Sequence, residues 1–385
     1  MKVLMYSDVF GGPTTTFIYN DLISLAQSHQ VKYLCVQRGS SRIDYKDVEV
    51  VEYREGRIKK KLKWIMEKNG WYLGFSNKQF SEKANGIISH FKPDIIHCNF
   101  GYEALRLTDN LNEVNKKIPL VINFLGYDAS FHLNRPSYVR KLKEITRMAN
   151  VYATCNTNYL KNNLESKKIH FCENRVIYTG VRLDFFDRKE IYPEKKNEYT
   201  YLQIATLSER KGQEITLLAF KKLLESYSGD MKLKLIIAGG KEDQYGEKIR
   251  NMPAELGIKN SVEFRDWIDP EEAKELMMQA DCCVHHSRTI NGRTEGIPTA
   301  VSEAMAMELP VISTVHAGIP ELVENGVNGF LIKENDVDSY AKRMLEIQSW
   351  DYLKINRDKV AGKFNITLRI GLLESYYKDI LSKKV

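Results

Sequence analysis

The sequence lacks the features that would place the protein across a membrane or in an oxidising compartment. No apolar run in its 385 residues approaches the roughly 20 residues that span a bilayer. The opening segment MKVLMYSDVF is short and is interrupted by Asp8, so it predicts a first β-strand rather than a signal peptide. The six cysteines include no CxxC pair, which argues against a zinc site or a disulfide framework and favours buried, reduced thiols. We therefore expect a cytoplasmic protein.

Low-complexity tracts and short repeats are also absent. The remaining composition, 43% hydrophobic and 28% charged, is typical of a globular protein. A chain of 385 residues is too long for one ordinary core and fits two domains of about 150–200 residues each.

The positive charge is concentrated in the first half of the chain. Residues 1–190 contain 30 Lys and Arg against 20 Asp and Glu, whereas the remainder contains 27 against 30. The basic segment 57–63 (RIKKKLK) is followed by four aromatic residues: Trp64, Trp71, Tyr72 and Phe75. This pattern predicts either an amphipathic segment on an anionic membrane surface or a solvated helix with buried aromatics. Because no recognised binding motif accompanies the charge, we expect no nucleic-acid partner.

Short β-rich runs alternate with helical stretches throughout, which is typical of parallel α/β sheets. In the first half we expect strands at 3–6, 31–36, 94–98, 119–124, 151–154 and 175–178. A second series is expected at 201–205, 233–238, 262–264, 282–285 and 310–313.

A polar stretch separates the two series and predicts the domain boundaries. Residues 187–198 (DRKEIYPEKKNE) form the expected linker, which gives a first domain over 1–187 and a second over 188–365. The final segment, 366–385, contains an amphipathic helix over 368–381. Ligands bind at the carboxyl ends of such parallel sheets, so two facing units predict a cleft between the domains.

The strongest chemical signal is the segment 293–307, RTEGIPTAVSEAMAM. Gly296 and Pro298 predict the start of a helix, whose free N–H groups and partial positive charge suit a diphosphate. Glu295 lies just before this helix and Glu303 lies inside it. Eight residues of helix span about 12 Å, comparable with the reach from a donor sugar to its ribose. The alternative is a capped helix whose glutamates are merely solvated.

This segment and several others resemble the retaining glycosyltransferases of family 4, of the bacterial exopolysaccharide and capsule type. The resemblance is carried by Glu295 and Glu303 with seven residues between them, and by the segments 208–212 (SERKG), 262–287 and 310–332. Weaker matches in the first half are KPDIIHCNF (92–100), LGYD (125–128) and YTGVRLDFF (178–186).

The resemblance implies a GT-B fold, in which two facing Rossmann-like domains bind the acceptor in the first and the donor in the second. The last helix, within 366–385, would cross back to the first domain. It implies that the enzyme transfers a hexose from a nucleotide-sugar with retention of configuration, and that it needs neither a metal ion nor a cofactor. UDP or GDP is favoured as the nucleotide of the donor. The acceptor would be lipid-linked or a nascent polysaccharide, and the enzyme would lie peripherally at the inner face of the cell membrane.

The resemblance also implies roles for individual residues. Glu295 would contact the hexose, Glu303 the ribose, and Lys211, with help from Arg210, the departing phosphates. The segment Gly296, Ile297, Pro298, Thr299 and Ala300 would bind the same phosphates through its backbone N–H groups, which all of these residues except Pro298 carry. The loop after the first strand, with Gly11 and Gly12, would lie near the sugar and the diphosphate.

Two positions depart from the family pattern. Leu125 stands where the family usually has histidine, and Thr206, within the expected donor site, stands where it usually has arginine. We expect Arg210 and Asp128 to compensate. His97 and Asn99, at the end of an expected strand, are further candidates for acceptor contact, with a structural role as the other interpretation of His97.

Two other functions stay open on the sequence alone. One is a GT-B nucleotide-sugar epimerase, and the other is a catalytically silent subunit that only binds a nucleotide-sugar. Turnover that depends on an acceptor would separate both from a transferase.

Overall fold

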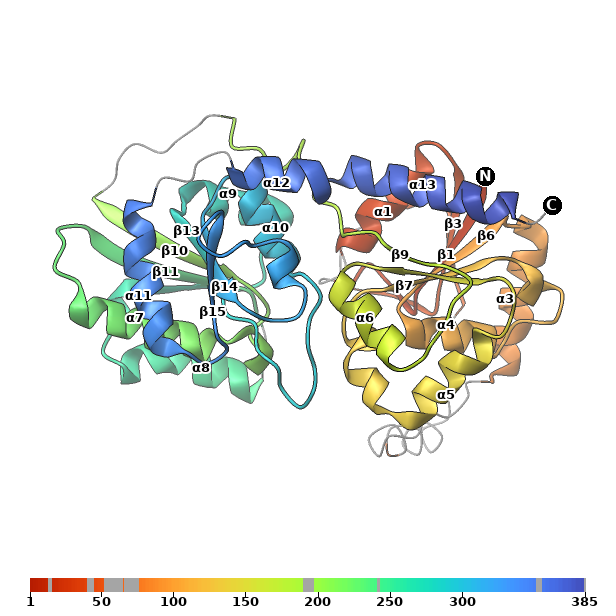
Figure 1. Ribbon diagram of the computed structural model, residues 1–385, viewed down its shortest axis with the longest axis horizontal. Helices are drawn as coiled ribbons and strands as arrows, with labels where there is room; N and C mark the ends of the chain where they lie inside the picture. The colour runs from red at the N-terminus through yellow and green to blue at the C-terminus, as the bar shows by residue number, and fades with distance from the viewer. Residues whose placement is uncertain are drawn as a thin grey trace. The chain divides into compact units, whose positions relative to one another are not determined.

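The computed structural model describes residues 1–12, 16–39, 45–51, 65, 76–189, 197–240, 243–350 and 355–383. The chain folds into two compact units (Figure 1): unit 1 is Met1–Gly180 with Ile366–Val385, and unit 2 is Val181–Asn365. The basic segment 57–63, its four neighbouring aromatic residues and residues 190–196 of the expected linker lie outside the described residues. None of the helices described is long and apolar enough to cross a membrane.

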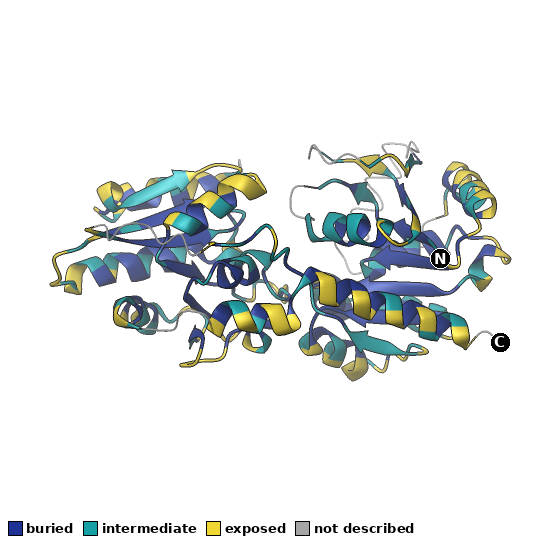
Figure 2. Cartoon of the chain, turned by 90° about the horizontal axis from the view of Figure 1, so that it is seen from above, coloured by how far each residue is buried: buried dark blue, intermediate teal, exposed yellow. Residues whose placement is uncertain are grey.

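Unit 1 is built on a parallel sheet of seven described strands in the order β5-β3-β1-β6-β7-β8-β9. The central strands β6, β7 and β8 are buried along their whole length, as Figure 2 shows, because their apolar side chains are covered on both faces. The strands are β1 (Lys2–Tyr6), β3 (Gln30–Cys35), β5 (Val48–Val50), β6 (Ile95–Asn99), β7 (Leu120–Phe124), β8 (Val151–Cys155) and β9 (Asn174–Val176); β2 (Val9–Phe10) pairs separately with β4 (Gln37–Arg38).

The last helix of the chain, α13 (Ile366–Ser382), belongs to unit 1 and packs beside α1 (Figure 1). Arg369 of α13 forms a two-pronged ion pair with Asp21 of α1, with both N–O distances at 2.7 Å. Both residues are at most 2% exposed. The remaining helices described in unit 1 are α1 (Thr16–Ala26), α3 (Lys78–Phe91), α4 (Gly101–Thr108), α5 (Pro136–Ile145) and α6 (Asn158–Ser166).

Unit 2 has a parallel sheet of six described strands in the order β12-β11-β10-β13-β14-β15, which is the strand order of the dinucleotide-binding fold. The strands are β10 (Glu198–Ile204), β11 (Lys232–Ala238), β12 (Val262–Arg265), β13 (Cys282–His285), β14 (Val311–Thr314) and β15 (Gly329–Ile332). The helices described are α7 (Gln213–Ser226), α8 (Gln244–Glu255), α9 (Pro270–Gln279), α10 (Thr299–Ala306), α11 (Val337–Glu346) and α12 (Ile355–Lys363).

The division between the units falls after Gly180, seven residues before the predicted boundary at 187. The intervening residues are bound to unit 2 because Arg357 of α12 donates hydrogen bonds to the carbonyl oxygens of Leu183 (3.1 Å) and Phe186 (2.8 Å). The cysteines agree with the prediction of reduced thiols, since all six are free and five are buried, with Cys172 exposed.

Candidate active site

Two loops of unit 2 bring the predicted donor residues to one edge of its sheet. The strand order reverses between β10 and β13, and ligands of such sheets bind outside the carboxyl ends of the strands at this switch point. The loop after β10 carries Arg210 and Lys211, and the loop after β13 carries Glu295. The sheet topology therefore brings together side chains that are about eighty positions apart in the sequence.

A compact charge cluster forms where these two loops meet. Lys211 Nζ lies 2.6 Å from Glu295 Oε2, and Arg210 Nη1 lies 3.3 Å from Glu295 Oε1. Burial acts to raise the pKa of Glu295, but the neighbouring cations, Lys211 above all, lower it to about 2. Glu295 is consequently ionised at neutral pH. It can accept hydrogen bonds from sugar hydroxyls but cannot donate a proton.

The loop that carries the two cations is held by glutamine side chains. Gln203 donates to the carbonyl oxygen of Lys211 at 2.7 Å, and Gln213 donates to that of Thr206 at 3.1 Å. Gly212 ends the loop at a φ of +57°, and a Cβ there would lie 2.2 Å from the carbonyl oxygen of His286. Glycine is thus required at that position.

The backbone of Glu295 is fixed by a hydrogen-bond chain that the sequence analysis missed. The N–H of Glu295 donates to His316 Nε2 at 3.3 Å. Because Nε2 accepts, Nδ1 carries the proton and donates to Glu334 Oε1 at 2.7 Å. Glu334 also accepts from the N–H of Thr289 at 2.8 Å, within the same loop as Glu295. A histidine just after an expected strand, in the segment STVHAG, was the available signal.

A neutral imidazole lies close to the charge cluster. Burial, followed by the charge of Lys211, lowers the pKa of His285 to about 3. Neither of its ring nitrogens has a hydrogen-bond partner among the described residues. The adjacent His286 has a partner of its own, because its Nε2 accepts a hydrogen bond from the N–H of Asn335 at 2.9 Å. Within the described chain no group of three or more His, Cys, Asp or Glu side chains could hold a metal ion.

The helix α10 begins at Thr299, directly after Pro298. Pro298 is its N-cap because the ψ of Pro298, 124°, is extended rather than helical. The first N–H groups of a helix have no partner inside it, so those of Thr299 and Ala300 lie at an end suited to an anion. The predicted residues Gly296 and Ile297 directly precede this end.

Glu303, on the second turn of α10, has a different environment from Glu295. Its side chain has no hydrogen bond or ion pair with any described residue, and burial raises its pKa to about 7. A carboxylate without a partner is available to accept hydrogen bonds from a ligand. Hydroxyl donors such as those of a ribose would favour its charged form.

We expect Glu303→Gln to stabilise the ligand-free protein at alkaline pH. The pKa of Glu303 is raised in the folded state from 4.5 to about 7, so the wild type loses stability as pH rises through this window. At about pH 8.5 the variant should be more stable by about 1–3 kcal/mol, and near pH 4.5 the difference should vanish. Urea unfolding at both pH values measures this. The exposed Glu255→Gln should show no such dependence, and an equal gain at both pH values would contradict the assignment.

The predicted glycine loop of unit 1 follows β2. Gly11 follows β2 with a φ of +75°, and Gly12 comes next in the same loop. The neighbouring Gly39 donates from its N–H to the carbonyl oxygen of Phe10 at 2.7 Å, and a Cβ on Gly39 would lie 2.4 Å from Gly11 O. The loop therefore follows the carboxyl end of β1, where it was expected.

Three other predicted residues of unit 1 are completely buried, which corrects the view of them as substrate contacts. His97 Nδ1 lies 2.7 Å from the hydroxyl of Tyr377 in α13, so His97 has the structural role that was its other interpretation. Asn99 accepts from Asn123 at 3.1 Å. Asp128 accepts from the N–H groups of Leu125, Gly126 and Gly101, at 2.9–3.2 Å. Asp128 thus shapes the loop after β7 rather than facing a ligand.

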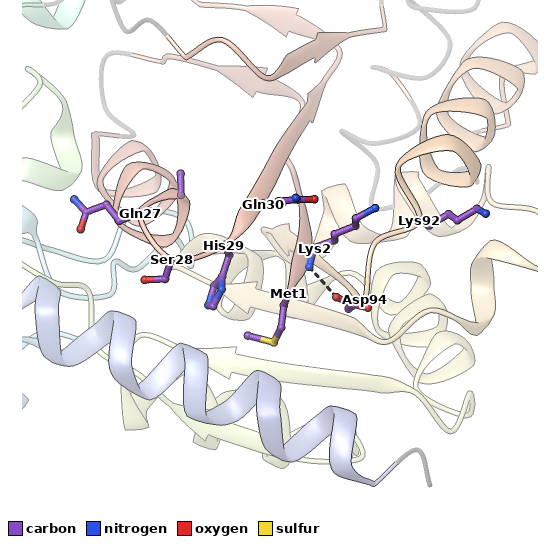
Figure 3. Close-up of a pocket in the computed structure, with 9 residues that line it drawn as sticks. Met1, Lys2, Gln27, Ser28, His29, Gln30, Lys92 and Asp94 are labelled. Atoms are coloured by element: carbon purple, nitrogen blue, oxygen red, sulfur yellow. Dashed lines mark hydrogen bonds between the residues drawn. The ribbon is translucent and has the colours of Figure 1, made fainter.

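A pocket of about 630 Å³ lies at the amino ends of β1 and β3 in unit 1 (Figure 3). Lys2, His29 and Gln30 line it, and the N–H of Lys2 donates to Asp94 at 2.7 Å. This is the edge of the sheet opposite to the one that binds ligands in such folds. The pocket therefore gives no reason to move the candidate site.

Comparison with known proteins agrees with the geometry of unit 2. Residues 184–356 match the family model described as "Glycosyl transferases group 1". The putative colanic acid biosynthesis glycosyltransferase WcaL of Escherichia coli K12 is 25% identical over 95% of this chain and 96% of its own length. The protein of the same name from Salmonella typhimurium is 33% identical, over 43% of this chain and 41% of its own length. A UDP-Gal:alpha-D-GlcNAc-diphosphoundecaprenol alpha-1,3-galactosyltransferase of E. coli is 25% identical over 54% of this chain and 55% of its own.

Solved structures resemble the whole chain. A glycosyltransferase from Rickettsia africae superposes with a TM-score of 0.77 and 18% identity, covering 99% of this chain and 98% of the other. Anabaena Alr3699/HepE in complex with UDP and glucose gives 0.75 and 17%, covering 98% and 100%. These likenesses show the GT-B fold, so the predicted fold is confirmed. The matched family model and the proteins similar in sequence support glycosyltransferase activity for this chain.

Proposed function

We propose that this protein is a retaining glycosyltransferase that moves a hexose from a nucleotide-sugar to an acceptor in cell-surface polysaccharide biosynthesis. The observation that carries the proposal is the cluster at the unit 2 switch point. There Lys211 and Arg210 form ion pairs with the ionised Glu295. Glu303, in the helix α10 that follows, has no partner among the described residues. Two carboxylates can bind the hydroxyl groups of a sugar and a ribose, and two cations can bind a diphosphate.

The step we propose needs no proton from the protein. The acceptor oxygen bonds to the anomeric carbon on the face from which the nucleotide departs, while the bond between that carbon and the phosphate oxygen breaks. The proton of the acceptor hydroxyl passes to the departing phosphate. Lys211, Arg210 and the amino end of α10 stabilise the charge that grows on the diphosphate, which is the dominant kind of contribution in such reactions. Glu295 orients the hexose hydroxyls.

The donor and acceptor classes are part of the proposal. The names of two similar proteins, one for colanic acid biosynthesis and one for a galactosyl transfer to a diphosphoundecaprenol acceptor, support a lipid-linked or nascent polysaccharide acceptor. We propose UDP or GDP as the donor nucleotide and no resident metal, since the cations of the cluster supply the counter-charge. Peripheral contact with the inner face of the membrane stays a prediction from the basic segment 57–63.

The test is a thermal-shift screen of the full chain against UDP, GDP, ADP and their sugars, in EDTA and again with Mg²⁺. We expect one nucleotide class to stabilise the wild type, by about 2.7 kcal/mol at a hundredfold its dissociation constant. EDTA should leave this shift unchanged, and Glu303→Ala should abolish it.

A turnover assay with the stabilising donor, run with and without acceptors, separates the rival functions. Binding without turnover for any acceptor would indicate a silent subunit, and turnover of the donor without an acceptor would indicate an epimerase. No stabilisation by any nucleotide would overturn the proposal.

A further inference from the structure

Unit 1 carries an aromatic cluster at the carboxyl ends of β6 and β7, and its function is not explained by the donor site. Phe100, Tyr102 and Tyr127 are mutually close, with ring centroids 5.6–5.8 Å apart and interplanar angles of 28–30°. We call these three residues the aromatic patch. Tyr127 is 36% exposed. The three rings are thus tilted by 28–30° to one another and form an aromatic surface at the ligand-binding edge of the sheet.

A chain of hydrogen bonds runs from the exposed ring to a buried carboxylate. The hydroxyl of Tyr127 lies 2.7 Å from that of Tyr102, which donates to Glu103 Oε1 at 3.0 Å. Glu103, 4% exposed, also accepts from the N–H of Asp8 at 2.9 Å. Asp8 in turn forms an ion pair with Arg106. The aromatic surface therefore has a polar margin of hydroxyl and charged groups.

The backbone at Phe100 is strained, which is a second sign that the patch is functional. Phe100 has a φ of +67° and a ψ of 132°, a conformation that bulky residues rarely adopt. The chain is fixed there because a Cβ on the next residue, Gly101, would lie 2.4 Å from the hydroxyl of Tyr138. Strain of this kind is concentrated at binding and catalytic sites.

We propose that the aromatic patch binds a pyranose ring of the acceptor glycan, an inference that rests on the proposed transferase function. A pyranose has an apolar C–H face and a rim of hydroxyl groups. The patch has the matching chemistry: an aromatic face for the C–H groups, with the hydroxyls of Tyr102 and Tyr127 at its margin for the hydroxyls of the sugar. Tyr127 provides the stacking face, and Tyr102 positions its hydroxyl.

Saturation-transfer NMR on the full chain without nucleotide tests this directly. The probes are the methyl glycosides of glucose, galactose and mannose, with maltose and lactose. We expect at least one probe to receive saturation on the C–H groups of a single ring face. Tyr127→Ala should weaken its binding by about tenfold or more, and Tyr127→Phe by only about threefold, because the ring is kept.

Trp267→Ala is the matched control, because Trp267 is an exposed aromatic residue of unit 2 at 52% exposure. It should leave saccharide binding within about twofold of wild type. The proposal is overturned if no probe binds the wild type, if Tyr127→Ala and Trp267→Ala act alike, or if uridine competes with the saccharide at the patch.

The nucleotide screen keeps the two proposals apart. Nucleotide binding that depends on Glu303, together with saccharide binding unaffected by Tyr127→Ala, would overturn the patch and leave the transferase standing. Saccharide binding that depends on Tyr127, with no nucleotide bound by the wild type, would support a saccharide site at the patch and overturn the transferase.

Discussion

Replacement of Lys211 by alanine is expected to lower kcat by about 10²–10³-fold, the loss seen when one preorganised charge stabiliser is removed. Lys211 Nζ lies 2.6 Å from Glu295 and is held by a loop whose carbonyl oxygens are bound by Gln203 and Gln213. The cation is thus in place before the diphosphate gains charge. Steady-state transfer with the donor identified by the nucleotide screen measures the effect.

Lys234→Ala is the control for this variant. Lys234 pairs with Glu263 at 2.7 Å between two strands of the same unit, and it takes no part in the charge cluster. We expect its activity within about twofold of wild type, as for most surface substitutions. If Lys211→Ala kept more than about a third of the wild-type kcat, a role in stabilising the leaving group would be untenable.

Asp21→Ala should be strongly destabilising, at about 3–5 kcal/mol. Removing one partner of a buried ion pair leaves the other as an uncompensated charge. Arg369 would keep only the carbonyl oxygens of Ile177 and Tyr178, to which it donates at 2.8 and 2.9 Å. Urea unfolding, followed by a probe within unit 1, gives the free energy.

Two further variants test the cause. In Asp21→Ala/Arg369→Met the buried charge is also removed, so the double variant should be more stable than Asp21→Ala alone. Glu82→Ala breaks an exposed helical pair with Lys78, also in unit 1, and should cost less than about 1 kcal/mol. Equal losses from Asp21→Ala and Glu82→Ala would show that the buried pair is no more stabilising than the exposed one.

Strands and helices with local signals could be predicted from the sequence. The bounds of β13, Cys282–His285, agree with the prediction because a short apolar run is bounded by polar residues. The helix α9, Pro270–Gln279, also has a local signal, because Asp269 and Glu272 form a capping box around Pro270. The strand β15 was missed, since it begins at Gly329, a residue that weakens a strand signal. There a Cβ would lie 2.5 Å from the carbonyl oxygen of Val311, so the reason for glycine is a contact with another strand.

The residues of the donor site could be predicted from the sequence, but the contacts between them could not. The motif pointed to Glu295, Glu303 and Lys211, whereas the 2.6 Å ion pair depends on how the sheet brings two loops together. The partners of His97 and Asp128 could not be predicted for the same reason. The partner of His97 is Tyr377, 280 positions further along the chain, and those of Asp128 are backbone N–H groups. Neither kind of partner leaves a local pattern in the sequence.

The return of α13 to unit 1 sets an order of events during synthesis. Asp21 and Arg369 are 348 positions apart, so the first unit cannot be completed until the second has been made. At the usual rate of translation, roughly 20–70 s pass between the synthesis of Asp21 and that of its counter-ion Arg369. Unit 2, whose residues 181–365 are contiguous, is free to fold first. A ribosome that stalls shortly before Arg369 would thus release a chain with a finished second unit and an incomplete first one, exposed to proteases.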